Sequence, residues 1–133
     1  MKFYFDTSIW LDIVLDRGNN GKVAKELLNK IIIFDQFVVY SDAVIFELQI
    51  VGLSNFEINN LLSLAKPDNI VRIKSTKEQT ILAKQIAKKL NIPKLDVLHA
   101  IISRDCGAQL VSRDWDFEKI KNITKTKRPE ELI

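Results

Sequence analysis

Cysteine, histidine, glycine and proline are all scarce in this 133-residue chain, which contains 1 Cys, 1 His, 4 Gly and 3 Pro. A single cysteine, Cys106, cannot close an intrachain disulfide or form a multi-thiolate metal site, so neither a disulfide-rich secreted domain nor a zinc fold is expected. The composition, 47% hydrophobic and 28% charged, excludes a disordered or fibrous chain. We expect one globular domain over residues 1–133, located in a reducing cytoplasm.

Long hydrophobic runs are also missing. The runs Ile31–Phe34 and Val97–Ile102 fall well short of the roughly 20 apolar residues that a membrane-spanning helix needs. At the N-terminus, Asp6 interrupts the apolar residues too early for the core of a signal peptide. We therefore expect no membrane association.

Charge is unevenly distributed along the chain. Residues 1–65 carry 5 basic and 8 acidic side chains, whereas residues 66–133 carry 15 and 9, which gives the overall net charge of +3. The basic C-terminal half can attract a polyanion such as a nucleic acid. Surface lysines are common in proteins without such a partner, so charge alone leaves the question open.

Short β-branched or aromatic runs alternate with longer helical stretches, which is typical of a βαβ protein with a mostly parallel sheet. The helix-like segments carry start signals, namely Ser8, then Asn20 or Gly21, and two capping boxes, Ser54–Glu57 and Ser75–Glu78. The predicted strands are Lys2–Phe5, Phe37–Tyr40, Ile70–Ile73, Gln109–Ser112 and, more weakly, Asn122–Lys125.

A further helix is predicted over Asp42–Leu53, and it is apolar around most of its circumference. Two explanations remain open: the helix is enclosed within the monomer, or its excess apolar surface contacts a second copy or another protein.

Acidic residues mark the expected carboxyl edge of the sheet, where ligands bind in parallel α/β folds. Asp6 follows the first predicted strand, and Asp114 and Asp116 follow the fourth. Asp96 begins a helical run, and Glu47 lies inside the apolar helix, where an unpaired carboxylate would cost several kcal/mol. Asp6, Asp96 and Asp114 also stand where helix N-caps are expected, whereas Glu47 needs a bound cation, an arginine or lysine, or a proton.

Carboxylates that meet without compensation repel one another and raise their pKa values. A divalent cation removes this conflict, and oxygen ligands without a His or Cys cluster favour Mg²⁺ or Mn²⁺. Such an ion polarises a phosphoryl oxygen and activates water, as metal-dependent phosphodiester cleavage requires.

Four motifs, in order along the chain, resemble the PIN-domain ribonucleases and within them the VapC-type toxins: Phe3–Ser8 (FYFDTS), Ser41–Glu47 (SDAVIFE), Leu95–Ala100 (LDVLHA) and Leu110–Phe117 (LVSRDWDF). The resemblance extends to the closing Arg128–Leu132. It implies a three-layer α/β/α sandwich around a short, mostly parallel sheet.

The resemblance also implies the site. Asp6, Glu47, Asp96 and Asp114 would form the catalytic metal site, with Asp116 as an outer or second-ion ligand, and Ser8 and Ser112 would support it with their hydroxyls. The family often has Asn in place of Ser8. His99, alone among apolar neighbours, is more typical of a packed, hydrogen-bonded side chain than of a ligand, although its spacing from Asp96 places both on one helix face.

Basic residues are candidates for phosphate contacts, which give affinity without much sequence choice. Arg113 and Lys94 are the candidates nearest the acids, and Arg113 can instead pair with an acid. Other basic residues form two groups: one in 119–128, and one, typical of a solvated helix face, in 84–94.

These observations favour a Mg²⁺- or Mn²⁺-dependent endoribonuclease, the toxin of a VapBC-type pair, that cleaves RNA with an activated water. The resemblance implies a homodimer and a small VapB-like antitoxin as partners. The alternatives are a PIN-domain nuclease of RNA maturation or quality control, and a catalytically silent PIN-like binding module.

Overall fold

Five parallel strands form the centre of the protein in the order β3-β2-β1-β4-β5. This computed structural model describes residues 1–65 and 67–133. Because β1 pairs with both β2 and β4, the residues that follow these three strands lie side by side at one edge of the sheet. The strands are β1 (Lys2–Phe5), β2 (Phe37–Ser41), β3 (Ile70–Ile73), β4 (Gln109–Val111) and β5 (Thr126–Lys127).

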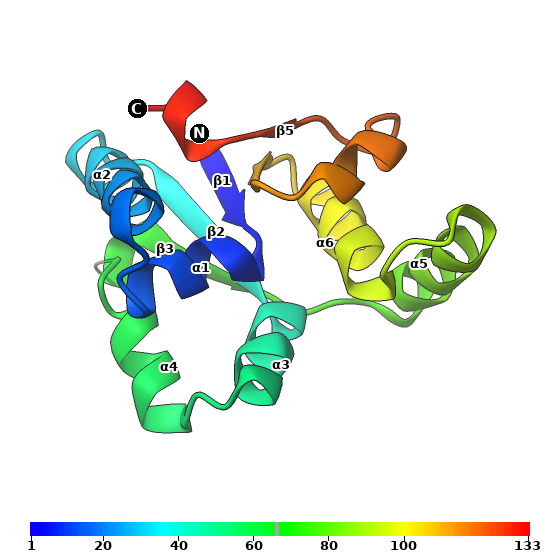
Figure 1. Ribbon diagram of the computed structural model, residues 1–133, viewed down its shortest axis with the longest axis horizontal. Helices are drawn as coiled ribbons and strands as arrows, with labels where there is room; N and C mark the ends of the chain where they lie inside the picture. The colour runs from blue at the N-terminus through cyan, green and yellow to red at the C-terminus, as the bar shows by residue number, and fades with distance from the viewer. Residues whose placement is uncertain (66) are drawn as a thin grey trace.

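Helices cover both faces of the sheet, which gives the expected three-layer α/β/α sandwich (Figure 1). On one face lie α1 (Thr7–Val14), α2 (Gly18–Ile33) and α4 (Asn55–Leu62), and on the other lie α5 (Lys77–Leu90) and α6 (Lys94–Asp105). Helix α3 (Asp42–Val51) lies at the carboxyl edge and contacts α1, α4 and α6. Short 3-10 turns occupy Pro67–Asn69 (η1), Trp115–Ile120 (η2) and Pro129–Glu131 (η3).

The core consists of apolar side chains from the central strands and the inner helix faces. In β1 the side chains of Phe3, Tyr4 and Phe5 are all buried, as expected of a parallel strand covered on both sides. Trp10 of α1 and Ile101 of α6 pack into the same core. Within the described residues, no helix is long and apolar enough to cross a bilayer.

The last strand differs from its prediction. We expected Asn122–Lys125, but β5 is Thr126–Lys127, which pairs with Leu110 and Val111 of β4. The 3-10 turn η2 and the turn after it bury Phe117 and Ile120 in the core, so the chain reaches the sheet edge only at Thr126.

Several helices begin at residues other than those predicted. Helix α1 is capped by Asp6, which accepts the Ile9 amide, while the hydroxyl of Ser8 donates to Asp6 instead of capping. Helix α2 begins at Gly18, before the predicted Asn20.

The second predicted capping box is displaced by one residue. Thr76 caps α5 and pairs with Gln79, because the amide and hydroxyl of Ser75 both donate to the carboxylate of Asp42. The first box, Ser54 with Glu57, caps α4 as predicted.

Helix α3 leaves much of its apolar surface uncovered. Ala43, Val44 and Leu48 are buried, but Phe46 and Ile50, among others, remain exposed. The helix is therefore not enclosed within the monomer.

Close packing between α1 and α2 depends on Gly21, because a Cβ atom there would lie 2.5 Å from the carbonyl oxygen of Asp12. We expect Gly21→Ala to lower the free energy of unfolding by about 1–3 kcal/mol, since backbone must shift to admit the methyl group. Chemical denaturation measures the change. Asn20→Ala, on the exposed face next to it, should change the value by less than about 0.5 kcal/mol, and equal effects would contradict the packing argument.

Candidate metal centre

The predicted catalytic acids line one cavity at the carboxyl edge of the sheet. Asp6, Glu47, Asp96 and Asp114 come from four different elements and border a cavity of about 180 Å³ that also contacts His99. The geometry therefore brings together all four acids that the sequence analysis grouped.

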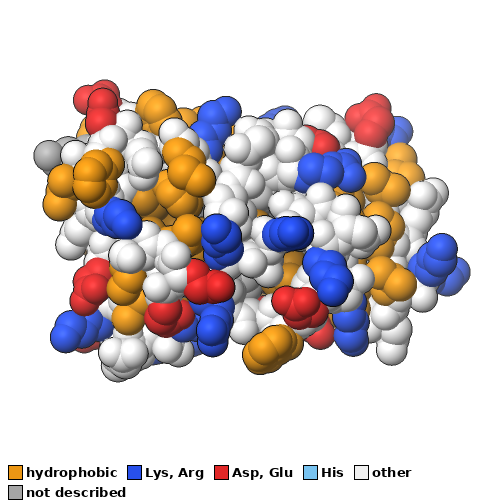
Figure 2. Space-filling model, turned by 90° about the horizontal axis from the view of Figure 1, so that it is seen from above, with side chains coloured by type: hydrophobic (Ala, Val, Ile, Leu, Met, Phe, Trp, Pro, Cys, Tyr) orange, Lys and Arg blue, Asp and Glu red, His pale blue; other side chains and the backbone are white. Residues whose placement is uncertain are grey.

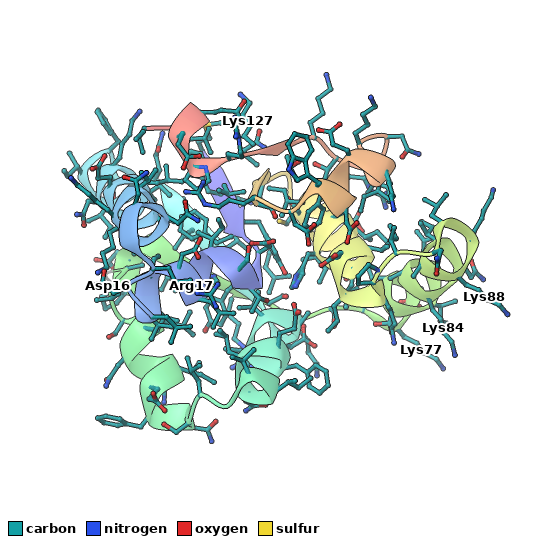
Figure 3. The ribbon with its side chains drawn as sticks, viewed as in Figure 1. Asp16, Arg17, Lys77, Lys84, Lys88 and Lys127 are labelled. Atoms are coloured by element: carbon teal, nitrogen blue, oxygen red, sulfur yellow. The ribbon has the colours of Figure 1, made fainter. Side chains whose placement is uncertain are left out.

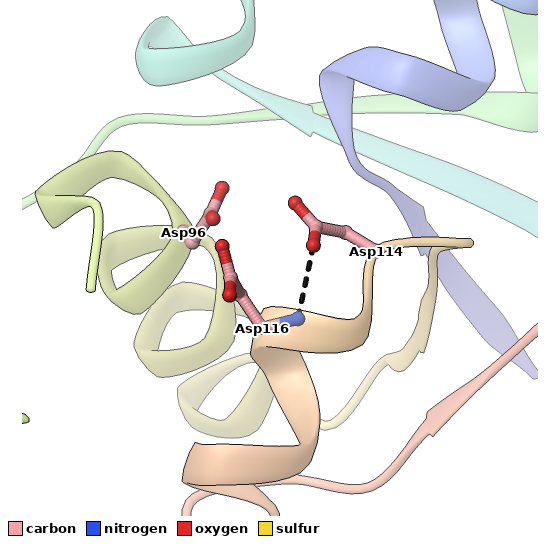
Figure 4. Close-up of side chains that lie close together, drawn as sticks. All are labelled: Asp96, Asp114 and Asp116. Atoms are coloured by element: carbon pink, nitrogen blue, oxygen red, sulfur yellow. Dashed lines mark hydrogen bonds between the residues drawn. The ribbon is translucent and has the colours of Figure 1, made fainter.

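Three carboxylates in particular form a close group. One oxygen each of Asp96, Asp114 and Asp116 lies within 4.8 Å of the others (Figure 4). Asp114 caps η2 and accepts the Asp116 amide at 2.9 Å, which fixes the turn between the two acids. Asp96 reaches the group from the first turn of α6; the N-cap of that helix is Pro93, so Asp96 does not cap it.

Asp6 lies behind this group and is held by hydrogen bonds. Its Oδ1 accepts the hydroxyl of Ser8 at 2.6 Å and its Oδ2 accepts the hydroxyl of Ser112 at 2.6 Å. The Ser112 hydroxyl in turn accepts the amide of Asp114 at 3.0 Å. Both predicted supporting serines thus contact Asp6, and Ser112 also connects it to the turn that carries Asp114.

Glu47 has a histidine as its partner, which the sequence analysis did not consider. Its Oε1 accepts the hydroxyl of Thr7 at 2.7 Å and bonds Nε2 of His99. Because a carboxylate only accepts, Nε2 is the donor in that bond. Burial pushes the pKa of Glu47 upward, but the hydrogen bond and charge of His99, with help from Thr7, leave that pKa below its ordinary value.

The contact continues into the core as a chain of hydrogen bonds. Nδ1 of the buried His99 lies 2.6 Å from the Tyr4 hydroxyl, which lies 2.6 Å from the Ser41 hydroxyl. Burial raises the pKa of Tyr4 well above its ordinary value, so the phenol stays protonated and donates to one neighbour. Glu47 of α3 is thereby tied through α6 to strands β1 and β2.

Burial and neighbouring negative charge act together on Asp96. Burial and the nearby charge of Asp114 raise the pKa of Asp96 from 3.8 to about 7; the charge of His99 opposes this shift, and the charges of Asp6 and Glu47 add to it. Burial also raises the pKa of Asp6, against the opposing effect of its serine partners. Negative charge at this edge is therefore costly without a compensating cation.

The donor set fits a hard divalent cation. Asp96, Asp114 and Asp116 offer oxygen atoms close enough to share one ion, and oxygen ligands are those that Mg²⁺ and Mn²⁺ prefer. His99 offers no free nitrogen, since both ring nitrogens are hydrogen-bonded.

Arg113 is directed towards acids rather than into the cavity. Its guanidinium pairs with Glu130 of η3 and with the buried Asp12 of α1, which Arg17 also contacts. A phosphate would have to compete with these carboxylates, so the geometry favours the pairing alternative for Arg113.

The other basic residues that the sequence analysis singled out are exposed. Lys94 is exposed at the start of α6, and Figure 3 shows Lys77, Lys84 and Lys88 pointing outward from α5, as a solvated helix face would. Lys127 lies on β5, and Lys and Arg side chains are spread over the face seen in Figure 2.

Three participants in this site were not identified from the sequence: Thr7, Tyr4 and Ser41. Thr7 follows a predicted acid and Ser41 follows a predicted strand, so their positions could have indicated that they belong to the site. The sequence around Tyr4 indicates only a core residue of a strand.

Comparison with known proteins follows this geometry. The sequence pattern of the PIN domain matches residues 3–123. The chain belongs to the PIN domain family. A solved structure, "Crystal structure of VapBC2 from Rickettsia felis bound to a DNA fragment from their promoter", shares the fold with a TM-score of 0.62 and 22% identity over 92% of this chain and 95% of that chain. No curated protein matches.

In this PIN domain, removing the charge of Asp96 should stabilise the metal-free protein. The raised pKa means that the folded state holds the proton more tightly than the unfolded state between about pH 4 and pH 7, so wild-type stability falls as pH rises through that window. We expect Asp96→Asn in EDTA at pH 8 to raise Tm by about 3 °C or more, with little difference at pH 4.

Thermal unfolding followed by circular dichroism from pH 4 to pH 8 tests this expectation. Asp105→Asn, at the far end of α6, is the control, because hydrogen bonding from Gln79 lowers the pKa of Asp105 and its neutralisation should bring no gain. A Tm below wild type for Asp96→Asn at pH 8 would contradict the repulsion described above.

Two substitutions at His99 separate the contribution of its hydrogen bonds from that of its ring packing. His99→Gln keeps an N–H donor that can reach Glu47, whereas His99→Leu leaves both Glu47 and Tyr4 without this partner. We expect His99→Leu to cost about 2 kcal/mol or more of unfolding free energy at pH 7, and His99→Gln clearly less, as measured by urea denaturation. Equal losses would mean that ring packing, not hydrogen bonding, dominates.

Proposed function

We propose that this PIN domain is a Mg²⁺- or Mn²⁺-dependent endoribonuclease and the toxin of a VapBC-type pair. The observation that carries the proposal is the convergence on one cavity of carboxylates from the end of β1, from α3, from α6 and from the turn after β4. PIN domains are in general nucleases, which agrees with this chemistry. The lone Cys106 supports a reducing cytoplasm as the place of this activity.

The acids have different roles in this proposal. Asp96, Asp114 and Asp116 would hold the ion directly, because one carboxylate oxygen of each lies within 4.8 Å of the others. Asp6 and Glu47, each held by hydrogen bonds, would complete the negative field from the buried side. When bound, Mg²⁺ or Mn²⁺ supplies the positive charge that polarises a phosphoryl oxygen and lowers the pKa of water.

RNA would be bound by the basic C-terminal segment. Lys119, Lys121, Lys125, Lys127 and Arg128 are all exposed and lie within one acid-free stretch. Contacts from such side chains to phosphates give affinity that falls with salt and carries little sequence preference. Lys94, exposed at the start of α6 near Asp96, is placed for a similar contact.

Exposed apolar side chains support protein partners as well. Phe46, Ile50 and Val51 of α3 and Phe56 of α4 are exposed, and large exposed apolar surface marks interaction sites. We assign this surface to a small antitoxin protein and to a second copy of the chain, in keeping with the VapC resemblance.

The purified protein tests the nuclease proposal directly. We expect single-stranded RNA to be cleaved with Mg²⁺ or Mn²⁺ and not with EDTA, and Asp96→Asn to lower the rate by about 100-fold or more through loss of a ligand. Asp105→Asn is the matched control on the same helix and should cleave like wild type.

Measurements of metal binding distinguish the proposed nuclease from a catalytically silent binding module. Mn²⁺ should raise the Tm of wild type, because a ligand that binds only the folded state stabilises it, and should raise that of Asp96→Asn much less. Binding without cleavage of any RNA would indicate a silent module. Cleavage that survives both EDTA and Asp96→Asn would refute the proposal.

A further inference from the structure

A second, polar pocket adjoins the metal centre, and most of its lining residues have no role in the proposed catalysis. It has a volume of about 210 Å³, lies between η2, β5 and η3, and shares Asp114 with the acidic group. Its other lining residues include Trp115, Glu118, Thr126, Arg128 and Glu131, and we refer to it as the Trp115 pocket.

Trp115 is the most informative residue of this pocket. Its side chain is 78% exposed, whereas the other tryptophan, Trp10, is fully buried in the core. Isolated exposed apolar residues are common, so exposure alone decides nothing. Trp115, however, stands between two members of the acidic group, Asp114 and Asp116, and lines a pocket that opens beside them. An indole in this position offers a flat face next to the place where a phosphodiester would be cut.

The charges of the pocket decide which part of a nucleotide it accepts. Asp114, Glu118 and Glu131 contribute three carboxylates to the lining, and Arg113 and Arg128 contribute two guanidinium groups. The guanidinium of Arg113 is paired with Asp12 and Glu130, which lie outside the lining, so the acids of the pocket are in excess. A phosphate would be repelled by this surplus of acids, whereas the N–H donors of a base would be attracted to it.

We infer that the Trp115 pocket binds one unpaired base of the RNA substrate, stacked on the indole of Trp115, with its amino edge directed towards Glu118 and Glu131. Single-stranded RNA is recognised in this way elsewhere, by aromatic stacking and by hydrogen bonds to base edges. Guanine presents two adjacent N–H donors that match a carboxylate, whereas uracil has no amino group. The pocket should therefore prefer guanine to uracil, and this inference rests on the proposed RNA cleavage.

Binding can be measured without cleavage by working in EDTA. The probes are fluorescein-labelled heptamers, one of uridines alone and one with a single central guanosine, and the readouts are fluorescence anisotropy and tryptophan emission. We expect the guanosine heptamer to bind more tightly and to quench the indole emission, because Trp10 is inaccessible. Trp115→Ala should weaken binding about fivefold or more, and Trp115→Phe by less.

Phe34→Ala is the matched control: it removes an aromatic side chain that is 64% exposed at the end of α2 and lines neither cavity, so it should bind like wild type. Glu118→Gln should reduce the preference for guanosine while Trp115 still stacks. Circular dichroism should show that all four variants fold, since the substituted side chains are exposed.

The outcomes separate this inference from the proposed function. If Trp115→Ala binds both heptamers like wild type, or if wild type binds them equally, the base pocket is refuted even when metal-dependent cleavage is observed. If Trp115→Ala instead changes only the oligomeric state on size-exclusion chromatography, Trp115 is a protein contact and the inference fails. Absence of any RNA cleavage by wild type would refute the nuclease proposal itself.

Discussion

Repulsion between carboxylates at one edge of the sheet is the constraint on which the rest of this structure depends. Parallel strands end together, so acids that follow different strands are forced into one space. Burial and the charge of Asp114 raise the pKa of Asp96 to about 7, which shows that this arrangement costs folding free energy. A protein that kept such a group without using it would gain stability from losing the charge of Asp96.

Hydrogen bonds from the surrounding polar side chains reduce the cost in folding free energy of the buried carboxylates. Asp6 is bonded by two serine hydroxyls and a backbone amide, and Glu47 by Thr7 and His99. Each bond restrains an oxygen atom as well as stabilising its charge, so the buried half of the site is rigid before any ligand arrives. Rigid placement of this kind is what preorganised electrostatic sites require.

The sequence was sufficient to predict the strands and the grouping of the acids, because both depend on local pattern and on the geometry of parallel sheets. Apolar runs located β1 to β4 to within one residue at their ends. The sequence was not sufficient to predict contacts that depend on how helices pack. Glu47 and His99 are separated by 52 positions, and only the packing of α3 against α6 brings them together.

Competition between neighbouring side chains for the same hydrogen-bond partners explains why α1 and α5 are capped by residues other than those predicted. Asp6 and Ser8 both carry oxygen atoms suited to capping α1, and the carboxylate is the acceptor because the hydroxyl can donate to it. Ser75 resembles a cap in the sequence, but its donors are used by Asp42, so Thr76 caps α5. Such choices depend on the nearest acceptor in space, which the linear pattern does not specify.

Burial of the acidic side chains decreases from the core towards the surface, and this difference separates the acids that are held by hydrogen bonds from those that can bind a cation. Asp6 is buried and fully hydrogen-bonded, Glu47 and Asp96 are half-buried, and Asp114 is exposed. Since hydrogen bonds occupy the oxygens on the buried side, the exposed side keeps oxygens that can accept a cation from solvent. The same exposed side carries Trp115 and the basic stretch that follows it, so positive charge lies beside the acids there. In the proposed nuclease, cation and phosphodiester would both reach Asp114 from this side, and neutralisation of its charge by the cation would favour binding of the phosphodiester.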